Sequence, residues 1–456
     1  MDIPLLARLL WLRHRLHARD AWSSTRLRRH QEHALSELRR FAYERSPFYS
    51  RFHRGKIDRP LNELPVLTKA EMMASFDELV TDRSVRLAEV QKHVAETDGT
   101  RRFRDHYWVA LTSGSTGLRG VFLSDPTEWV TVLASYARAN DWAGIPAGPT
   151  HRLRLAVVSS KVPWHQSAQV GMSLRSSFLP VLRLDATESV GDLVARLNEF
   201  QPDSLVAYAS MARLLAEEQV AGRLRISPRA VMCASEVLTP ETARRIEQAW
   251  AVRPFNVYGA TETAGIASEC SQQAGFHLYE DLVITEVVDE KNRLVPPGTY
   301  GTKLLVTVLF SRTQPLIRYE MSDSVRLASS LCPCGRPFAL IADIQGRAEE
   351  VLRMEGRAGA HVSIHPYLFH RVLEPLPARE WQVVQEAEGL RLLIAGAGTG
   401  FNEAALKDGL ARELEGQGAQ LPAIRIERLE HLPRTGLGKS PLIRTTLPRT
   451  PGEPRP

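Results

Sequence analysis

Residues 204–263 read SLVAYASMARLLAEEQVAGRLRISPRAVMCASEVLTPETARRIEQAWAVRPFNVYGATET, and this stretch decides the fold. It repeats one order, in which a short apolar run is followed by a longer helical pattern. SLVAYAS precedes MARLLAEEQVAG, RAVMCAS precedes TPETARRIEQAW, and the strand PFNVYGATET ends in a loop. Strands that alternate with helices are typical of a mainly parallel α/β sheet, which binds ligands at the carboxyl ends of its strands.

Outside this stretch, the same alternation extends back to about residue 105 and follows helical sequence. One proline-marked turn interrupts the helical part, and Thr68 is placed there to N-cap the next helix. From residue 282 the pattern changes to closely spaced strands, which predicts a β-meander or distorted barrel. We therefore predict a large α/β N-terminal domain, residues 1–345, that consists of a helical part (1–100), a core of mainly parallel sheets flanked by helices (105–281) and a β-rich subdomain (282–345).

A smaller unit follows the segment GRAEE at residues 346–350. Its order is the strand WQVVQEAEGLRLLIAG, the helix NEAALKDGLARELEG and the strand AIRIERLEHL. This order fits a small, mobile α+β lid domain over residues 351–445. The proline-rich residues 446–456 are predicted to be a disordered tail.

The composition is that of an ordinary globular protein of two or three domains, with 456 residues, 43% hydrophobic and 24% charged. It excludes a disordered tail protein, a collagen-like fibre and a disulfide-stapled miniprotein. No uninterrupted apolar run approaches the ~20 residues of a membrane helix, and arginines interrupt the apolar N-terminus. With four cysteines, we expect a cytoplasmic protein with reduced thiols and no transmembrane segment.

The excess of positive charge belongs to one end of the chain. The net charge is +6, but residues 1–60 carry +8 and the remainder −2. Leu5, Leu9, Leu12 and Leu16 lie on one face of a basic helix. Such a helix could lie on an anionic membrane surface, touch nucleic acid, or dock its leucines on the body with its arginines in water, and we favour docking. No nucleic-acid partner is expected.

The first chemical signal is the loop LTSGSTGLRG at residues 111–120. Its glycines expose backbone N–H groups, and its serines and threonines add hydroxyl donors, so it is suited to cradle an anion. It lacks the Gly-Lys-Ser/Thr ending of a P-loop. A flexible connection between strands stays open as the alternative.

Four further segments follow in order, YGATET (258–263), RYEMSD (318–323), GRAEE (346–350) and LPRTGLGK (432–439). With the loop, they resemble the ordered motifs of the adenylate-forming (ANL) superfamily. SPFYSRFH, LPVLTKAEM and CPCGRP are similar to features of its phenylacetate–coenzyme A ligase branch. The resemblance implies an ATP- and Mg²⁺-dependent ligase that activates a carboxylic acid, an aryl acid first of all, as acyl-adenylate and transfers it to coenzyme A. Its partners would be small molecules, and a homodimer stays open.

The resemblance also implies a nucleotide site. Tyr258 would stack on adenine, Asp323 would accept the ribose hydroxyls, and Arg119 stands where the family often carries lysine. In RYEMSD, Ser322 replaces the usual glycine. The residues assigned to ATP binding are Ser113, Gly114, Ser115, Thr116, Gly117, Ser235, Glu236, Tyr258, Gly259, Asp323 and Arg347.

Three residues are implied to carry the chemistry. Thr261 would contact the α-phosphate, Glu262 would hold Mg²⁺, and Lys439 would bridge the substrate carboxylate and the α-phosphate. Lysine is rare here, with 8 among the 58 basic residues, which favours a chemical role for Lys439. Glu349 falls on the hinge position, where aspartate is commoner.

The acid's side chain is implied to lie between the loop and YGATET. The candidate pocket walls are Trp164, His165, Tyr208 and Ala234. Aromatic walls suit a planar aryl acid, although Trp164 packing on the sheet is the open alternative. His361 and His365 replace a more hydrophobic stretch of the branch, so an amine or another nucleophile stays open as acceptor. Activation of an unusual small acid in secondary metabolism also stays open. A non-catalytic nucleotide-binding protein is the further alternative.

Three cysteines and a histidine form a candidate zinc site: Cys270, His277, Cys332 and Cys334. Cys₃His is a structural zinc set, although the Cys-x-Cys spacing is tighter than usual. Unrelated thiols are the alternative. Cys233 lies on an apolar strand and is predicted to be a small core residue.

Overall fold

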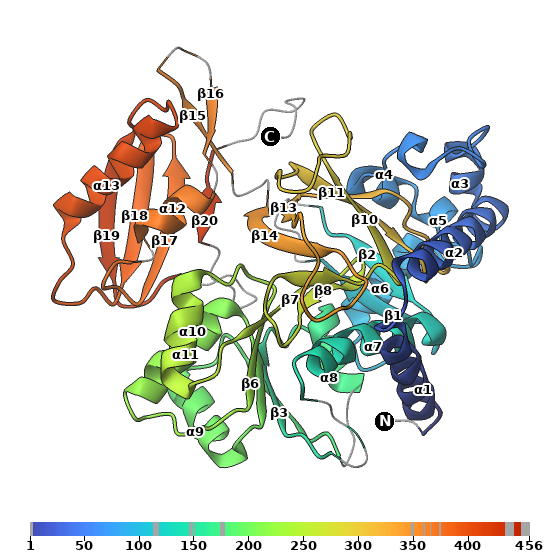
Figure 1. Ribbon diagram of the computed structural model, residues 1–456, viewed down its shortest axis with the longest axis horizontal. Helices are drawn as coiled ribbons and strands as arrows, with labels where there is room; N and C mark the ends of the chain where they lie inside the picture. Colours follow the sequence, from blue (N-terminus) through green and yellow to red (C-terminus); the bar gives the residue numbers. More distant parts are fainter. Residues whose placement is uncertain are drawn as a thin grey trace.

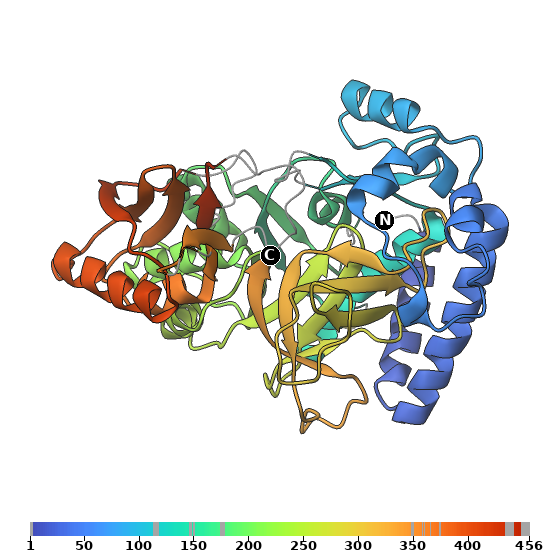
Figure 2. The same ribbon diagram turned by 90° about the horizontal axis from the view of Figure 1, so that it is seen from above.

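A computed structural model describes residues 3–112, 118–145, 148, 151–173, 178–347, 351–357, 359, 361–364, 366–373, 375–433 and 442–447. Figure 1 shows a large part built from residues up to 347, which we call the body, and a smaller part from residue 351 onward, which we call the C-terminal unit. Figure 2 shows the N-terminal helices and the C-terminal unit at opposite ends of the molecule.

The first hundred residues are helical, as predicted. Thr68 and Glu71 form a reciprocal capping box at the start of α4, which confirms the predicted N-cap. Within the described residues, no helix combines the length and apolar character that a membrane span requires. The helices are α1 (Ile3–Arg19), α2 (Ser24–Arg45), α3 (Pro47–Phe52), α4 (Lys69–Ala74), α5 (Phe76–Leu79) and α6 (Leu87–Glu96), with a 3₁₀ turn at Leu61–Glu63.

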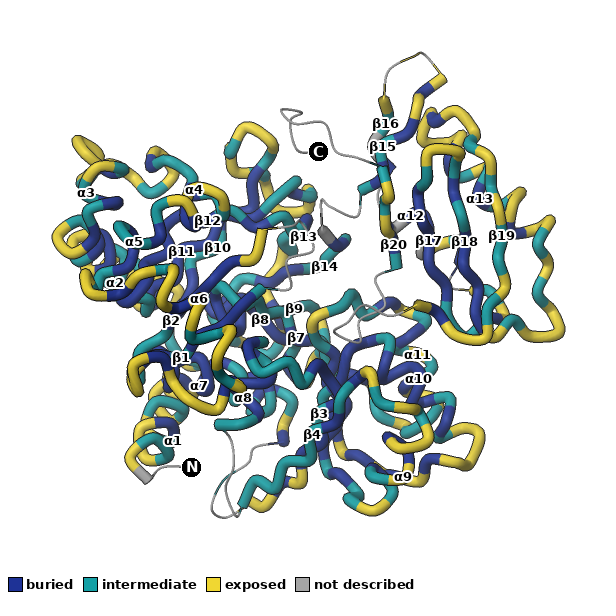
Figure 3. The backbone as a smooth tube through the Cα atoms, turned by 180° about the vertical axis from the view of Figure 1, so that it is seen from behind, coloured by how far each residue is buried: buried dark blue, intermediate teal, exposed yellow. Residues whose placement is uncertain are grey.

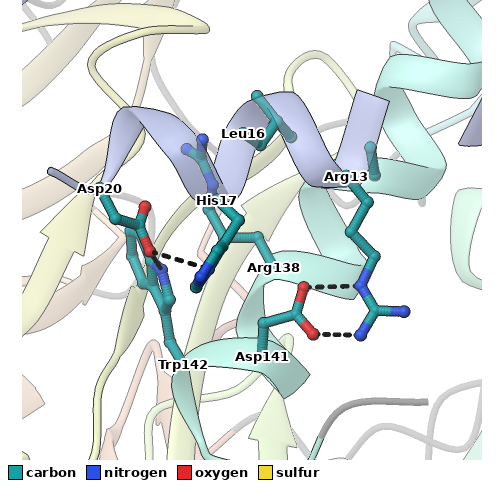
Figure 4. Close-up of a pocket in the computed structure, with 8 residues that line it drawn as sticks. Arg13, Leu16, His17, Asp20, Arg138, Asp141 and Trp142 are labelled. Atoms are coloured by element: carbon teal, nitrogen blue, oxygen red, sulfur yellow. Dashed lines mark hydrogen bonds and ion pairs between the residues drawn. The ribbon is translucent and has the colours of Figure 1, made fainter. Parts of the chain in front are cut away.

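Helix α1 docks on the body against α7 (Pro126–Trp142). Its leucines Leu9 and Leu16 are buried, which confirms docking. The expectation that the arginines lie in water is wrong for Arg13, whose guanidinium makes a bidentate ion pair with Asp141 of α7 (Figure 4). The ion pair offsets the cost of taking both charges partly out of water.

A second arginine of α1 reaches a fully buried carboxylate, that of Asp281. Arg138 of α7 donates to both oxygens of Asp281 at 2.7 and 2.8 Å, and Arg19 donates at 3.0 Å. Burial raises the pKa of Asp281, but the two guanidinium groups outweigh burial and lower it to about 2. This buried triad was not singled out from the sequence.

Nine strands form the core sheet: β3 (Leu155–Ser159), β4 (Val181–Asp185), β5 (Ser204–Ala207), β6 (Ala230–Ala234), β7 (Phe255–Ala260), β8 (Ala264–Glu269), β9 (Phe276–Leu278), β13 (Asp323–Leu327) and β14 (Leu340–Arg347). Their order is β13-β14-β9-β8-β7-β6-β5-β3-β4. The neighbours from β4 to β7 pair in parallel, which confirms the predicted parallel core.

Helices cover both faces of this parallel half. Side chains alternate along β6, so Val231 and Cys233 pack toward one layer of helices and Met232 packs toward α7. Cys233 is therefore the core residue that we predicted. The covering helices are α8 (Gln166–Ser173), α9 (Val190–Phe200), α10 (Ala209–Val220) and α11 (Pro240–Trp250).

The other half of the sheet is antiparallel and differs from the expected separate β-rich subdomain. Strands β13 and β14 complete the core sheet instead. Strands β10 (Val283–Val288), β11 (Lys303–Val308) and β12 (Tyr319–Met321) form a three-stranded sheet of their own. Local sequence patterns indicate that a segment is extended, but not which distant segment it pairs with.

The C-terminal unit has a four-stranded sheet in the order β19-β18-β17-β20, with β17 (Glu380–Glu386), β18 (Gly389–Ala395), β19 (Ala423–Leu429) and β20 (Ile443–Thr445). Figure 3 shows β17 and β18 buried and β19 partly exposed. The single strand predicted over WQVVQEAEGLRLLIAG is wrong, because this segment folds into the β17–β18 hairpin at Gly389, whose φ is +139°. The remaining elements are β15 (Leu352–Glu355), β16 (His361–Ile364), α12 (Pro366–Leu373) and α13 (Glu403–Gly416).

Candidate active site and cysteine–histidine cluster

The carboxyl ends of the parallel strands β3, β5, β6 and β7 lie at one edge of the core sheet. Residues 160–165 follow β3, Tyr208 follows β5, residues 234–236 close β6, and residues 258–262 run through the end of β7. Predicted segments that lie far apart in the sequence therefore meet at the edge where such sheets bind ligands.

The turn after β6, at Ser235 and Glu236, has an unusual backbone conformation and contacts the N-terminus of α10. Ser235 has a φ of +66°, in the left-handed region that few residues other than glycine adopt. The Glu236 carboxylate accepts the backbone N–H of Ser210 at 2.9 Å, in the first turn of α10. Helix N-termini offer unpaired N–H groups and favour anions, so α10 fixes the position of this carboxylate.

Tyr208 links the ends of two neighbouring strands. Its hydroxyl accepts the backbone N–H of Ser160, just after β3, at 2.9 Å, and the residue is 3% exposed. Burial, reinforced by the charge of Glu236, raises the pKa of Tyr208 to about 12. The phenol therefore stays neutral, and its hydrogen bond joins the carboxyl ends of β3 and β5.

The segment after Tyr258 bends tightly at Gly259, and a hydrogen bond from Gln166 fixes the backbone at Thr261. A β-carbon on Gly259 would lie 2.8 Å from the carbonyl oxygen of Ala264, so the bend requires glycine. The carbonyl of Thr261 accepts the side-chain amide of Gln166 at 3.2 Å, and Gln166 in turn accepts the hydroxyl of Tyr136 at 2.8 Å.

Sequence reasoning missed Tyr136 and Gln166. Burial, together with Tyr279 and the charge of Glu262, raises the pKa of Tyr136. Gln166 directly follows His165, one of the candidate pocket walls. Tyr136 lies on a long helix and has no local signal.

Asp323 and Arg347 are paired across two strands. Their Cα atoms are register partners at the end of the antiparallel β13–β14 pair. The structure thus brings the backbones of two predicted nucleotide-binding residues together, although 24 positions separate them in the sequence. In the same motif, Arg318 is a buried structural residue, which pairs with Glu286 at 3.1 Å.

Seven predicted site residues lie outside the described residues: Ser113, Gly114, Ser115, Thr116, Gly117, Glu349 and Lys439. Both ends of the loop LTSGSTGLRG are described. Strands β1 (Trp108–Leu111) and β2 (Val121–Ser124) pair antiparallel, and the N–H of Thr112 donates to the carbonyl of Gly120 at 3.0 Å. The loop is therefore the connection of a hairpin.

The predicted pocket walls have different surroundings. Trp164 is 8% exposed, and its ring packs edge-on against His93 of helix α6 at 5.7 Å. Ala234 is partly buried at the end of β6. His165 starts the first turn of α8, where its carbonyl accepts the N–H of Gln169. Of the four, Tyr208 and Ala234 lie at strand ends next to the Ser235 turn.

The three cysteines and the histidine come together in the body. The ligand atoms of Cys270, His277, Cys332 and Cys334 all lie within 4.8 Å of one another. The Cys270 and Cys332 sulfurs are 3.7 Å apart, and the Cys334 sulfur is 3.2 Å from Nε2 of His277. Tetrahedral zinc with Zn–S bonds of about 2.3 Å places sulfurs about 3.8 Å apart. The spacing fits a zinc ion.

The members of this cluster differ in ionisation: burial raises the pKa of the Cys332 thiol to about 12, whereas His277 and Cys334 are shifted toward the forms that bind a metal. Burial, together with the charge of Arg336, lowers the pKa of His277 to about 4, which leaves the imidazole neutral. Burial opposes ionisation of the Cys334 thiol, but hydrogen bonds from Arg336 outweigh it and lower the pKa. Neutral imidazole and thiolate are the forms that bind zinc.

The cluster adjoins the N-terminal helix. Trp142 packs edge-on against His277, with ring centroids 5.3 Å apart. Its indole N–H donates to the Asp20 carboxylate at 2.7 Å (Figure 4). Arg336 also donates to Asp20, at 3.2 Å. The end of α1 is thus tied to residues that surround the cluster.

A family model described as "AMP-binding enzyme" matches residues 57–307, more than half of the chain. The sequence is 28% identical to a phenylacetate-coenzyme A ligase of Thermus thermophilus over 205 residues, 43% of this chain and 45% of that protein. It is 31% identical to the enzyme of the same name from Pseudomonas putida over 172 residues, 36% of this chain and 38% of that protein. The chain thus spans less than half the length of either relative.

Solved structures share the fold. A 2-hydroxyisobutyryl-CoA ligase in the postadenylation state is 19% identical, with a TM-score of 0.71 over 94% of this chain and 91% of that chain. The same ligase in the thioesterification state, with 2-HIB-AMP and CoA, gives a TM-score of 0.58 at 19% identity over the same shares. The predicted mixed α/β class is confirmed, and the shared fold covers 94% of this chain.

Proposed function

Because the chain belongs to the AMP-binding enzyme family, we propose that it is an ATP-dependent ligase that joins a carboxylic acid, an aryl acid first of all, to AMP and then transfers the acyl group to coenzyme A. The observation that carries the proposal is the meeting of residues 234–236 and 258–262 at the carboxyl edge of the parallel strands. The two relatives named as coenzyme A ligases support this acceptor.

In the first proposed step, a carboxylate oxygen of the acid attacks the α-phosphorus of ATP and pyrophosphate leaves. Both reactants are anions, so cationic groups must offset their repulsion. Lys439 is proposed to bridge them, while Glu262 would hold Mg²⁺, which neutralises phosphate charge when bound. Thr261 is proposed to offer its hydroxyl to the α-phosphate from a backbone that Gln166 anchors.

The nucleoside is proposed to lie along the same edge. Tyr258 would stack on the adenine, while Ser235 and Glu236 would frame its other side from the fixed turn after β6. Asp323 and Arg347 are paired across β13 and β14: Asp323 would accept the ribose hydroxyls, and Arg347 would contact the ribose or a phosphate. In the second step, the coenzyme A sulfur attacks the acyl carbon and AMP leaves. The similar ligase was solved in postadenylation and thioesterification states, and we propose that this C-terminal unit also turns between the two steps, with Glu349 at the hinge.

The proposal is tested by pyrophosphate exchange and AMP release with a panel of aryl, aliphatic and small hydroxy acids, with and without coenzyme A. We expect exchange with at least one acid and a thioester when coenzyme A is added. AMP and hydroxamate formation without a thioester would favour an amine or another acceptor. ATP binding without exchange for any acid would favour a non-catalytic nucleotide-binding protein and overturn the proposal.

We also propose that Cys270, His277, Cys332 and Cys334 hold a structural zinc ion. The support is the donor set, its spacing and the neutral imidazole described above. The four ligands come from the β8–β9 region and from the loop before β14. Zinc would therefore join two segments that are separated by the three-stranded sheet in the sequence.

Replacing Cys270 by serine is expected to abolish zinc binding and to lower the free energy of unfolding by about 3 kcal/mol or more, because a structural metal contributes its binding energy to folding. Elemental analysis and urea unfolding measure the two effects. Cys233→Ala is the matched control, since Cys233 is buried away from the cluster in the core of the parallel half. Stoichiometric zinc in Cys270→Ser would contradict the assignment.

A further inference from the structure

Helix α10 connects the candidate nucleotide edge to the C-terminal unit. Its first turn donates to Glu236, as described above. One turn later, Arg213 donates from Nη2 to the backbone carbonyl of Ala378 at 2.9 Å. After a further turn, the Glu217 carboxylate lies 3.5 Å from Nε of Arg379. One helix therefore contacts both the edge and residues 378–379.

The contacts at Glu217 form a small network between the two parts. Glu217 is shared by Arg213 at 3.6 Å and Arg245 at 3.0 Å, both from the body, and by Arg379 from the C-terminal unit. The Arg213 side chain is 9% exposed, and that of Arg379 is 37% exposed. An ion pair that several charges share in a partly buried place is held more firmly than an isolated surface pair.

We infer that Arg213, Glu217 and Arg379 are positioning residues, which form a latch that holds the C-terminal unit in the orientation of this structure, and we assign that orientation to the adenylating step. The inference rests on the proposed function. β20 is the edge strand of the C-terminal sheet nearest the body in Figure 1. The latch joins the body to residues 378–379, so its contacts must break when the C-terminal unit turns for acyl transfer. In that second orientation the C-terminal unit lacks the contacts with Arg213 and Glu217, so these contacts favour the adenylation step alone.

Arg379→Ala tests the latch, because it removes one ion pair and leaves the body unchanged. We expect pyrophosphate exchange to fall about three- to fivefold, which is what a partly exposed ion pair can supply. Transfer of the acyl group from a synthetic acyl-adenylate to coenzyme A is expected not to fall. Arg371→Ala is the matched control, since Arg371 pairs at 2.8 Å with Glu413 inside the C-terminal unit. It should leave both rates unchanged.

Amide hydrogen exchange tests the latch independently of any enzymatic activity. Arg379→Ala, and Arg213→Gln as a second variant, are expected to speed amide exchange in residues 376–380, whereas Arg371→Ala is not. Unchanged exchange in both latch variants, or an equal fall of the two half-reactions in Arg379→Ala, would overturn the latch. No pyrophosphate exchange in the unmodified protein would instead overturn the proposed function, and the hydrogen-exchange result would still decide whether the contacts hold the C-terminal unit.

Discussion

Replacement of Lys439 by alanine is expected to lower the rate of acyl-adenylate formation about 10²- to 10³-fold while ATP binding changes little. The first step brings a carboxylate against a phosphate, and an ammonium group is a compact charge that can contact an oxygen of each. Its largest effect falls on the transition state, where the two anions are closest. Pyrophosphate exchange measures the rate, and calorimetry with ATP measures binding.

Other lysines show why this position is singled out. Lys161 and Lys303 form ion pairs with Glu188 and Glu320, each at 2.7 Å, so these two have structural partners. Lys407→Ala is the matched control, because Lys407 is exposed on α13 of the same unit. Lys439→Arg is expected to recover only part of the rate, since a planar guanidinium cannot replace a point charge. An unchanged rate in Lys439→Ala would refute the assignment.

Replacement of Asp281 by alanine is expected to lower the free energy of unfolding by about 3–5 kcal/mol, because it leaves Arg19 and Arg138 buried without their counter-charge. Urea unfolding at neutral pH measures the change. Asp289→Ala is the control, since Asp289 pairs at 2.7 Å with Arg293, whose side chain is 70% exposed, and such a surface pair is worth at most about 1 kcal/mol. If Asp281→Ala does not fold, Arg19→Ala tests the same site with the Arg138 pair intact.

The same carboxylate predicts a dependence on pH. The pKa of Asp281 is lowered from 3.8 to about 2 in the folded protein, so its stabilisation is complete above the unfolded value of 3.8 and is lost as the pH falls through about 2. The difference corresponds to about 2 kcal/mol. Asp281→Asn lacks this term, so between pH 4 and pH 2 its stability should fall less than that of the unmodified protein. Parallel pH profiles would contradict the role given to Asp281.

Much of the fold could be predicted because it depends on short-range patterns. Apolar runs followed by helical periodicity define β5, α10, β6 and α11, and Thr68 with Glu71 defines the start of α4. The errors concern long-range pairing. β13 and β14 join the core sheet, and residues 380–395 fold back on themselves at Gly389, although their apolar pattern also suits a single long strand.

In the candidate site, too, residues in short motifs could be predicted, whereas residues that act through long-range contacts could not. The ordered motifs supplied Tyr258, Glu262 and Asp323 because each belongs to a short, recognisable segment. Tyr136 and Gln166 have no motif and became visible only through the hydrogen bonds that connect α7 and α8 to Thr261. The latch at Glu217 was equally invisible, because its partner Arg379 is more than 160 positions away.

The sequence alone determined the family resemblance, the parallel core and the four members of the cysteine–histidine cluster, since these follow from residue type, order and local spacing. Only the tertiary structure decided that the cluster closes to metal-ligand distances, that Arg19 and Arg138 share Asp281, and that α10 contacts the C-terminal unit. The physical reason is that a buried charge or a metal ligand acts through its spatial neighbours, and folding selects those neighbours from segments hundreds of residues apart.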